Sequence, residues 1–147
     1  MRQEWKTYFE TIKLPEQLQT IIENKIQEVQ SLFDVNIEDI FVSNRRNEQK
    51  IEYISLWLFS NDRVFECKNF ISLDDYDMAP IGGNISYVNV QKTNYSQISS
   101  PTEDSVLTIS CYIGRGNLSC TLNAAGINCK YLINILKSKF NSNFAKV

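Results

Sequence analysis

The first third of the chain repeats apolar residues at the spacing of an α-helix. Residues 3–12 carry a first apolar stripe, whose members recur three or four positions apart: Trp5, Tyr8, Phe9 and Ile12. A longer stripe covers residues 15–33 and starts at Pro15, which suits the first turn of a helix because its missing N–H has no partner there. We therefore expect residues 1–35 to form an N-terminal helical segment that packs its apolar side on a sheet.

From about residue 39 the apolar period changes to two, which is typical of β-strands. The pattern predicts three segments, namely a short strand at 40–43, a polar loop at 44–49 and a long strand at 51–60. The dipeptide Asn61-Asp62 is a two-residue turn signal, so we expect residues 63–71 to run back along the long strand. A turn at that point predicts four cross-strand pairs: Leu56 with Cys67, Trp57 with Glu66, Leu58 with Phe65, and Phe59 with Val64.

The second face of this hairpin carries aromatic and apolar side chains among polar neighbours: Tyr53, Trp57, Phe59 and Val64. An exposed apolar surface of this size invites association. We expect the N-terminal helices to cover it; if they do not, these four residues are the candidate partner contacts. Substitution of Trp57 is predicted either to unfold the domain or to abolish partner binding with the fold intact.

The second half of the chain opens with a loop and a strand. Residues 73–84 have the composition of a loop, with two adjacent glycines, and residues 85–91 alternate as a strand. A second loop is expected at 99–104.

The clearest hairpin of the sequence follows that loop. Apolar residues alternate over 107–113 and again over 118–124, and a turn centred on Arg115-Gly116 places both apolar sets on one face. That register predicts three pairs: Ile109 with Leu122, Cys111 with Cys120, and Ile113 with Leu118. An amphipathic helix over 125–140 is predicted to close the chain.

This order of elements resembles the pleckstrin-homology-like domain superfamily, particularly its small bacterial members, over residues 38–140. Three stretches carry the resemblance: the Leu-Trp-Leu-Phe-Ser-Asn-Asp-Arg-Val hairpin at 56–64, the strand at 85–90, and the last hairpin with its helix at 105–140. The resemblance implies an α+β fold in which two antiparallel sheets form a partly open barrel, closed by a C-terminal helix. That fold has seven strands, of which six are recognisable from this pattern. Residues 1–35 lie outside the resemblance, and we expect them to form one compact domain with the barrel over 36–147.

Composition narrows the range of functions. The 147 residues suit one domain, and no apolar run approaches the roughly 18 residues of a membrane span. The start has no leader pattern, so we expect a cytoplasmic protein. The chain has no histidine, which excludes His-based acid–base catalysis and most zinc sites. A net charge of −2 argues against nucleic-acid binding. The abundance of Asn, Ile and Lys favours an AT-rich, bacterial source.

The four cysteines are Cys67, Cys111, Cys120 and Cys129. They form no Cys-x-x-Cys pair, which disfavours a metal site. Opposed positions in an antiparallel pair lie close enough for a disulfide, so the geometry permits a Cys111–Cys120 bridge, which a reducing compartment opposes. We expect all four to be small buried side chains, and a bridge would make thermal stability sensitive to reductant.

Two polar clusters are candidate sites. Arg45, Arg46 and Lys50 form the densest basic cluster, and arginine binds phosphate oxygens through two parallel hydrogen bonds. They also occupy the loop where phosphoinositide-binding members of the resembled superfamily carry their basic residues. A weaker candidate is a divalent-metal site at Asp74, Asp75 and Asp77, which lacks the spacing of an EF-hand.

Neither the residues nor the resemblance points to catalysis, and no cofactor is expected. We therefore expect a non-enzymatic interaction or adaptor domain that binds a protein partner. The partner would dock on the aromatic sheet face or add a strand to an open sheet edge. The alternative is a module that binds phosphate or a lipid headgroup through Arg45, Arg46 and Lys50.

Overall fold

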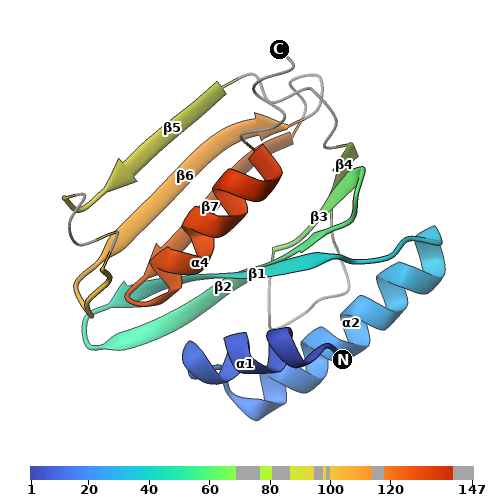
Figure 1. Ribbon diagram of the computed structural model, residues 1–147, viewed down its shortest axis with the longest axis horizontal. Coiled ribbons are helices and arrows are strands. Elements are labelled where there is room, and N and C mark those ends of the chain that lie inside the picture. The colour runs from blue at the N-terminus through green and yellow to red at the C-terminus, as the bar shows by residue number, and fades with distance from the viewer. Residues whose placement is uncertain (69–76, 81–86, 95–97, 99, 114–117, 141–147) are drawn as a thin grey trace.

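The computed structural model describes residues 1–68, 77–80, 87–94, 98, 100–113 and 118–140, and shows an α+β fold (Figure 1). The helices are α1 (Gln3–Thr11), α2 (Glu16–Phe33) and α4 (Asn128–Ile135), and a π-helical turn, η1 (Leu136–Phe140), continues α4. The strands are β1 (Asp39–Asn47), β2 (Lys50–Phe59), β3 (Arg63–Cys67), β4 (Asp77–Pro80), β5 (Tyr87–Lys92), β6 (Val106–Ile113) and β7 (Leu118–Ala125).

The strands form two antiparallel sheets, ordered β1-β2-β3-β4 and β5-β6-β7. The four predicted pairs between β2 and β3 are confirmed, and so are the three predicted between β6 and β7. In both hairpins a one-residue slip would turn one apolar set to the wrong face, so burial selects the register.

Three segment predictions are wrong in extent. The polar loop expected at 44–49 is largely strand: β1 continues to Asn47, β2 begins at Lys50, and the turn holds only two residues. Strands β1 and β2 remain paired beyond their apolar residues because backbone hydrogen bonds do not require apolar side chains. An ion pair of 2.9 Å between Arg45 and Glu52 links the two strands in this polar part. Strand β4 lies inside the expected loop at 73–84.

The C-terminal helix also begins later than predicted. Strand β7 extends through Ala125, and Gly126 then turns the chain at φ 63° before α4 starts at Asn128. This left-handed conformation suits glycine, because a side chain there would be strained.

The four-stranded sheet lies between helices on both faces. On one face, the ring of Phe33 in α2 lies 5.1 Å from that of Phe65. On the other, the ring of Phe140 lies 6.1 Å from that of Phe59, which is fully buried. Figure 1 accordingly shows α1 and α2 below β1 and β2, and α4 above them, in front of β6 and β7.

The expectation that the N-terminal helices cover the aromatic face is therefore wrong for most of that face. Trp57 and Val64 share the fully buried face of Phe59, which meets the C-terminal helix. Only Tyr53 reaches the N-terminal segment, where its hydroxyl donates hydrogen bonds to the carbonyls of Ile12 (2.9 Å) and Lys13 (3.1 Å). The register of β1 and β2 shifts between Ser43 and Asn44, which leaves Ile54 unpaired between Tyr53 and Ser55, and this β-bulge accounts for the change of direction.

The two sheets are not closed into a barrel and meet at a seam between β1 and β7. Side chains bridge this seam. The hydroxyl of Ser43 donates to the carbonyl of Asn123 (3.1 Å) and accepts from its N–H (2.8 Å), and the side-chain oxygen of Asn44 accepts from the N–H of Ala125 (2.9 Å). One apolar cluster nevertheless joins α1, α2, both sheets and the C-terminal helix.

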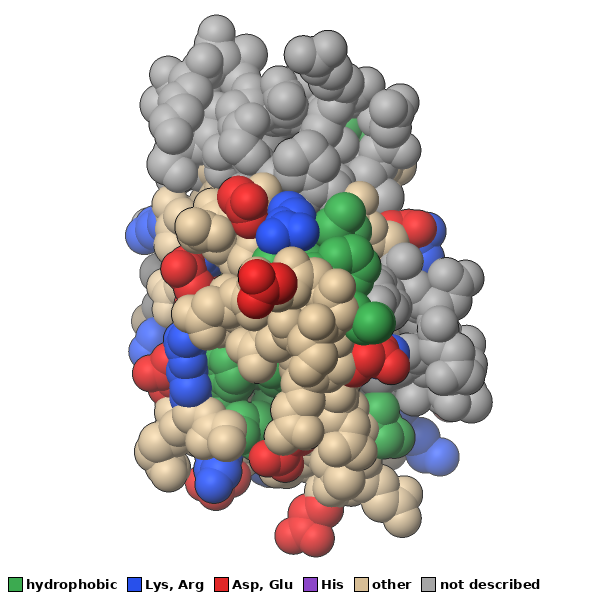
Figure 2. Space-filling view, turned by 90° about the vertical axis from the view of Figure 1, so that its right-hand side faces the viewer, with side chains coloured by type: hydrophobic (Ala, Val, Ile, Leu, Met, Phe, Trp, Pro, Cys, Tyr) green, Lys and Arg blue, Asp and Glu red, His purple; other side chains and the backbone are tan. Residues whose placement is uncertain are grey.

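Acidic and basic side chains are interspersed on the side of the molecule that Figure 2 shows, with no large field of one sign. Within the described parts of the chain, no helix combines the length and the apolar character needed to cross a membrane. All four cysteines are buried free thiols, as the sequence analysis expected.

Candidate functional site

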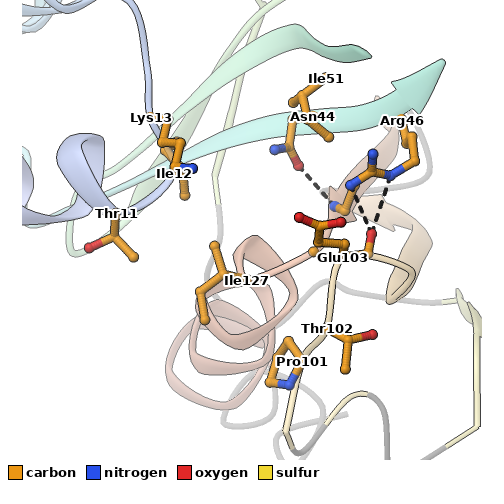
Figure 3. Close-up of a pocket in the computed structure, with 12 residues that line it drawn as sticks. Thr11, Ile12, Lys13, Asn44, Arg46, Ile51, Pro101, Thr102, Glu103 and Ile127 are labelled. Carbon is orange, nitrogen blue, oxygen red and sulfur yellow. Dashed lines mark hydrogen bonds between the residues drawn. The ribbon is translucent and has the colours of Figure 1, made fainter. Parts of the chain in front are cut away.

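A pocket of about 510 Å³ opens where four parts of the chain come together (Figure 3). Its walls are the α1–α2 connection, the far end of the β1–β2 hairpin, the segment before β6, and the β7–α4 junction. The side chains that matter for its chemistry are Lys13, Asn44, Arg46, Thr102, Glu103 and Ile127.

Lys13 reaches the pocket because helix α1 ends abruptly. The N–H of Lys13 bonds to the carbonyl of Glu10 (3.1 Å), and the N–H of Leu14 bonds to that of Phe9 (2.9 Å). Lys13 itself takes a left-handed conformation at φ 58°. The hydroxyl of Tyr53 then holds the turn against β2, so the backbone that carries Lys13 is anchored on both sides.

Arg46 reaches the pocket from the strand extension that the sequence analysis missed. It pairs across the hairpin with Ile51, and both side chains line the pocket. Its Nε and Nη2 atoms donate to the backbone carbonyl of Glu103 at 3.2 and 2.9 Å. These bonds orient the guanidinium of Arg46.

The β7–α4 junction forms the opposite wall. The N–H of Gly126 bonds to the carbonyl of Ser105 (2.8 Å), and the hydroxyl of Ser105 accepts from the N–H of Thr102 (2.9 Å). A Cβ placed on Gly126 would lie 3.8 Å from the carbonyl oxygen of Thr102, so the two segments run close together. Next to them, Ile127 points its side chain into the pocket and remains 40% exposed.

The charged side chains that line the pocket are more basic than acidic. Among the described residues, no carboxylate lies within 4.0 Å of the charged nitrogens of Lys13 or Arg46. The acidic side chain in the lining is Glu103. Helix α4 starts at this wall, and the N-terminal end of a helix carries partial positive charge. The arrangement suits a small anionic group attached to an apolar body that contacts Ile127.

The predicted basic cluster does not converge on one site. Arg45 pairs with Glu52 on the opposite face of the hairpin, and Lys50 lies on that same face opposite Asn47. Glu52 also accepts a hydrogen bond from Asn47 (2.8 Å), and this bond together with that from Arg45 holds the pKa of Glu52 below its ordinary value. Only Arg46 of the predicted three lines the pocket.

The other predicted sites fare differently. Trp57, Phe59 and Val64 are fully buried and Tyr53 is half-buried, so the aromatic face is an internal packing surface and offers no docking site. Asp74 and Asp75 lie outside the described residues, and Asp77 pairs with Lys68 at 2.9 Å. Within the described ranges no three Cys, Asp or Glu side chains gather as metal ligands.

Away from the pocket, the inner face of β3 holds a buried carboxyl. Glu66 is 8% exposed, its Oε1 has no hydrogen-bond partner among the described residues, and burial raises its pKa to about 7. Burial also raises the pKa of Cys67 to about 12 and that of Cys129 to about 11. The hydrogen bond between Cys111 and Cys120 lowers the pKa of Cys111 and raises that of Cys120, but neither thiol reaches the surface.

Sequence reasoning missed Lys13, Glu103 and Ile127 as site residues. Lys13 stands among other polar residues just before Pro15, and no local signal reports its left-handed backbone. Ile127 follows the apolar spacing of the last helix, which by itself predicts a core residue. Residues 45–50 are all polar and exposed, so no alternation in this run could have shown that β1 continues and that Arg45 and Arg46 face opposite sides.

No family model, curated protein or solved structure matches this chain.

Proposed function

We propose that the chain is a non-enzymatic binding module that holds a protein partner through an acidic side chain seated in the pocket. One observation carries the proposal: Lys13 and Arg46, 33 positions apart in sequence, line one pocket, and neither has a carboxylate within 4.0 Å among the described residues. An incoming carboxylate gains charge-assisted hydrogen bonds there without displacing an existing ion pair.

The chemistry of the lining favours a protein partner over a lipid headgroup. A phosphoinositide carries several phosphate charges, whereas the pocket offers two cations together with the carboxylate of Glu103. The further cations of the predicted cluster, Arg45 and Lys50, face the other side of the hairpin. An acidic side chain brings one charge, and a neighbouring apolar side chain would contact the exposed Ile127.

The lining also favours binding over catalysis. Its two hydroxyl groups are engaged in local backbone contacts: Thr11 donates to the carbonyl of Thr7 (2.8 Å), and Thr102 accepts from the N–H of Asp104 (3.3 Å). Among the described residues, neither hydroxyl hydrogen-bonds to a side chain that could act as its base. The order of four strands, three strands and a closing helix supports a pleckstrin-homology-like binding module, although the sheets are not closed into a barrel.

The adjacent arginines provide a matched test. A displayed library of random short peptides is selected on the wild-type protein, and the selected peptides are measured against Arg46→Gln, Lys13→Gln and Arg45→Gln. We expect the first two variants to weaken binding about fivefold each, because a solvent-facing ion pair contributes on the order of 1 kcal/mol. Arg45→Gln should leave binding unchanged, since Arg45 lies outside the pocket and is paired with Glu52.

Two further measurements decide the class of partner. Replacing Asp and Glu in the selected peptides with Asn and Gln is expected to remove binding. The pocket would be refuted as the binding site if the neutral peptides bound as tightly as the acidic ones. It would also be refuted if Arg46→Gln, Lys13→Gln and Arg45→Gln weakened binding equally. Flotation with phosphatidylcholine vesicles that contain phosphatidylserine or phosphatidylinositol phosphate tests the headgroup alternative. If the wild-type protein binds these vesicles and Arg46→Gln does not, the ligand of the pocket is a lipid headgroup and not a protein.

A further inference from the structure

The fold protects its sheet edges unequally. At β1 the outward N–H of Val42 donates to the hydroxyl of Tyr8 (2.9 Å), and its carbonyl accepts from the side chain of Asn128 (2.8 Å). Strand β4 has four residues and ends on Pro80, and short strands and prolines both discourage pairing with another chain. Strand β5 has six residues, contains no proline, and pairs on one side with β6.

The outward backbone groups of β5 follow from its register. The N–H of Thr93 bonds to the carbonyl of Val106 (3.0 Å), and the N–H of Val106 bonds to the hydroxyl of Thr93 (3.4 Å), so this pair belongs to the hydrogen-bonded positions of the ladder. Bonded positions alternate in an antiparallel pair, so Asn89 and Gln91 also bond to β6. The N–H and C=O groups of Val88, Val90 and Lys92 therefore point away from the sheet, and no hydrogen bond to them occurs among the described residues.

The side chains at this edge carry a second signal. Val90 pairs with the fully buried Ile109 and lies on the core side of the sheet, yet it is 44% exposed. Lys92 pairs with Leu107 on the same side, is exposed, and has no carboxylate within 4.0 Å among the described residues. The apolar face of this sheet thus ends on an exposed valine beside an exposed cation that has no ion-pair partner in the described part of the chain, and Figure 1 places β5 at the outer margin of the molecule.

We propose that β5 accepts an extended segment of the protein partner as a fourth strand of the β5-β6-β7 sheet. The segment carries an apolar side chain opposite Val90 and, two positions away on the same face, an acidic side chain opposite Lys92. Main-chain hydrogen bonds to the three outward residues supply the attachment, and the two side-chain positions supply selectivity. This inference rests on the proposed function in one respect, that the partner is a protein.

Amide exchange tests the edge directly. The selected peptides are added to the wild-type protein, and hydrogen–deuterium exchange is followed residue by residue by NMR. We expect the amides of Val88, Val90 and Lys92 to slow on peptide addition, while those of Asn89 and Gln91, already bonded to β6, change little. Unchanged exchange at the three outward amides would refute the proposal. If exchange at these amides slows with rising protein concentration in the absence of peptide, the strand that pairs with β5 comes from a second copy of the chain.

A matched pair of variants provides an independent test. Val90→Lys places an inward charge on the edge, which natural sheets use to prevent pairing, and is expected to weaken peptide binding about tenfold. Val106→Lys alters a valine of the same 44% exposure on the central strand β6 and is expected to leave binding unchanged. Equal effects of the two variants would contradict strand addition.

The same measurements separate this inference from the proposed function. If Arg46→Gln weakens peptide binding but the outward amides of β5 do not change, the peptide binds in the pocket and does not add a strand to β5. If the peptide still protects those amides in Lys13→Gln and Arg46→Gln, it adds a strand to β5 and does not depend on the pocket. If Val90→Lys does not fold, the exchange measurement on the wild-type protein still decides the matter.

Discussion

The hydroxyl of Tyr8 donates a hydrogen bond of 2.9 Å to the side-chain oxygen of Asn128, a residue 120 positions away. The same hydroxyl accepts from the N–H of Val42 (2.9 Å), while the amide nitrogen of Asn128 donates to the carbonyl of Val42 (2.8 Å) and to Asn44 (2.9 Å). Tyr8 is buried, and burial raises its pKa well above the ordinary value, so the hydroxyl stays protonated. This network ties α1 to the edge of β1 and to the start of α4.

Tyr8→Phe is expected to destabilise the protein. The ring of Tyr8 packs 4.3 Å from that of Tyr131 and would remain, but the N–H of Val42 would lose its acceptor and Asn128 its donor. Leaving buried polar groups unpaired costs about 1–3 kcal/mol, measurable as a lower free energy of unfolding in urea.

Tyr53→Phe serves as the control for that measurement. It also removes one hydroxyl, but Tyr53 is half-buried, and water can replace it at the carbonyls of Ile12 and Lys13. We expect a loss below about 1 kcal/mol. Similar losses in both variants would show that the buried network contributes nothing special to stability.

The stability of the protein is expected to depend on pH through Glu66. Its pKa of about 7 in the folded state exceeds the value of about 4.5 in an unfolded chain, so the folded state holds the proton more tightly. The contribution is therefore fully present below about pH 4.5 and is lost as the pH rises to about 7. Its size is on the order of 1–3 kcal/mol.

Glu66→Gln isolates this effect. The variant should match the wild type near pH 5 and be more stable than it near pH 8, because glutamine has no charge to bury. Urea unfolding at the two values measures the difference. A gap between variant and wild type that stays constant with pH would contradict the assignment.

Glu48→Gly is expected to stabilise the β1–β2 hairpin. Glu48 holds φ 58° in the two-residue turn, a conformation that costs most side chains about 1–2 kcal/mol and glycine nothing. Part of that gain is offset by the greater freedom of glycine in the unfolded chain, leaving about 0.5–1 kcal/mol. Unfolding in urea tests the gain, and Gln49→Gly, which lacks the positive φ, should bring none.

The thermal midpoint is expected to be the same with and without reductant. Cys111 and Cys120 stand directly opposite each other in β6 and β7, but both are free thiols. A midpoint that falls when reductant is added would show that this pair forms a disulfide in the purified protein.

Much of the local structure could be read from the sequence. The periods of the apolar residues predicted α1 and α2 within two residues at each end, and the turn signals predicted both hairpin registers. These features are local: a turn sets which residues face each other, and alternation sets which face is apolar.

What covers each face was decided by packing between distant segments. The sequence showed that Phe59 needed a cover, but only the tertiary structure placed Phe140 there and α2 on the opposite face at Phe65. Both amphipathic helices present a suitable apolar stripe, so periodicity cannot choose between them.

The pocket was decided in the same way. The sequence grouped Arg45 with Arg46 because they are neighbours, but consecutive residues of a strand point to opposite faces, and the unforeseen extension of β1 separated them. A left-handed backbone conformation places Lys13 in the same pocket as Arg46, and Ile127 lines that pocket from the C-terminal part of the chain. The sequence by itself determined most of the helices and strands and the registers of the β2–β3 and β6–β7 hairpins. The tertiary structure decided which side chains share a site, because that depends on contacts between segments far apart in the chain.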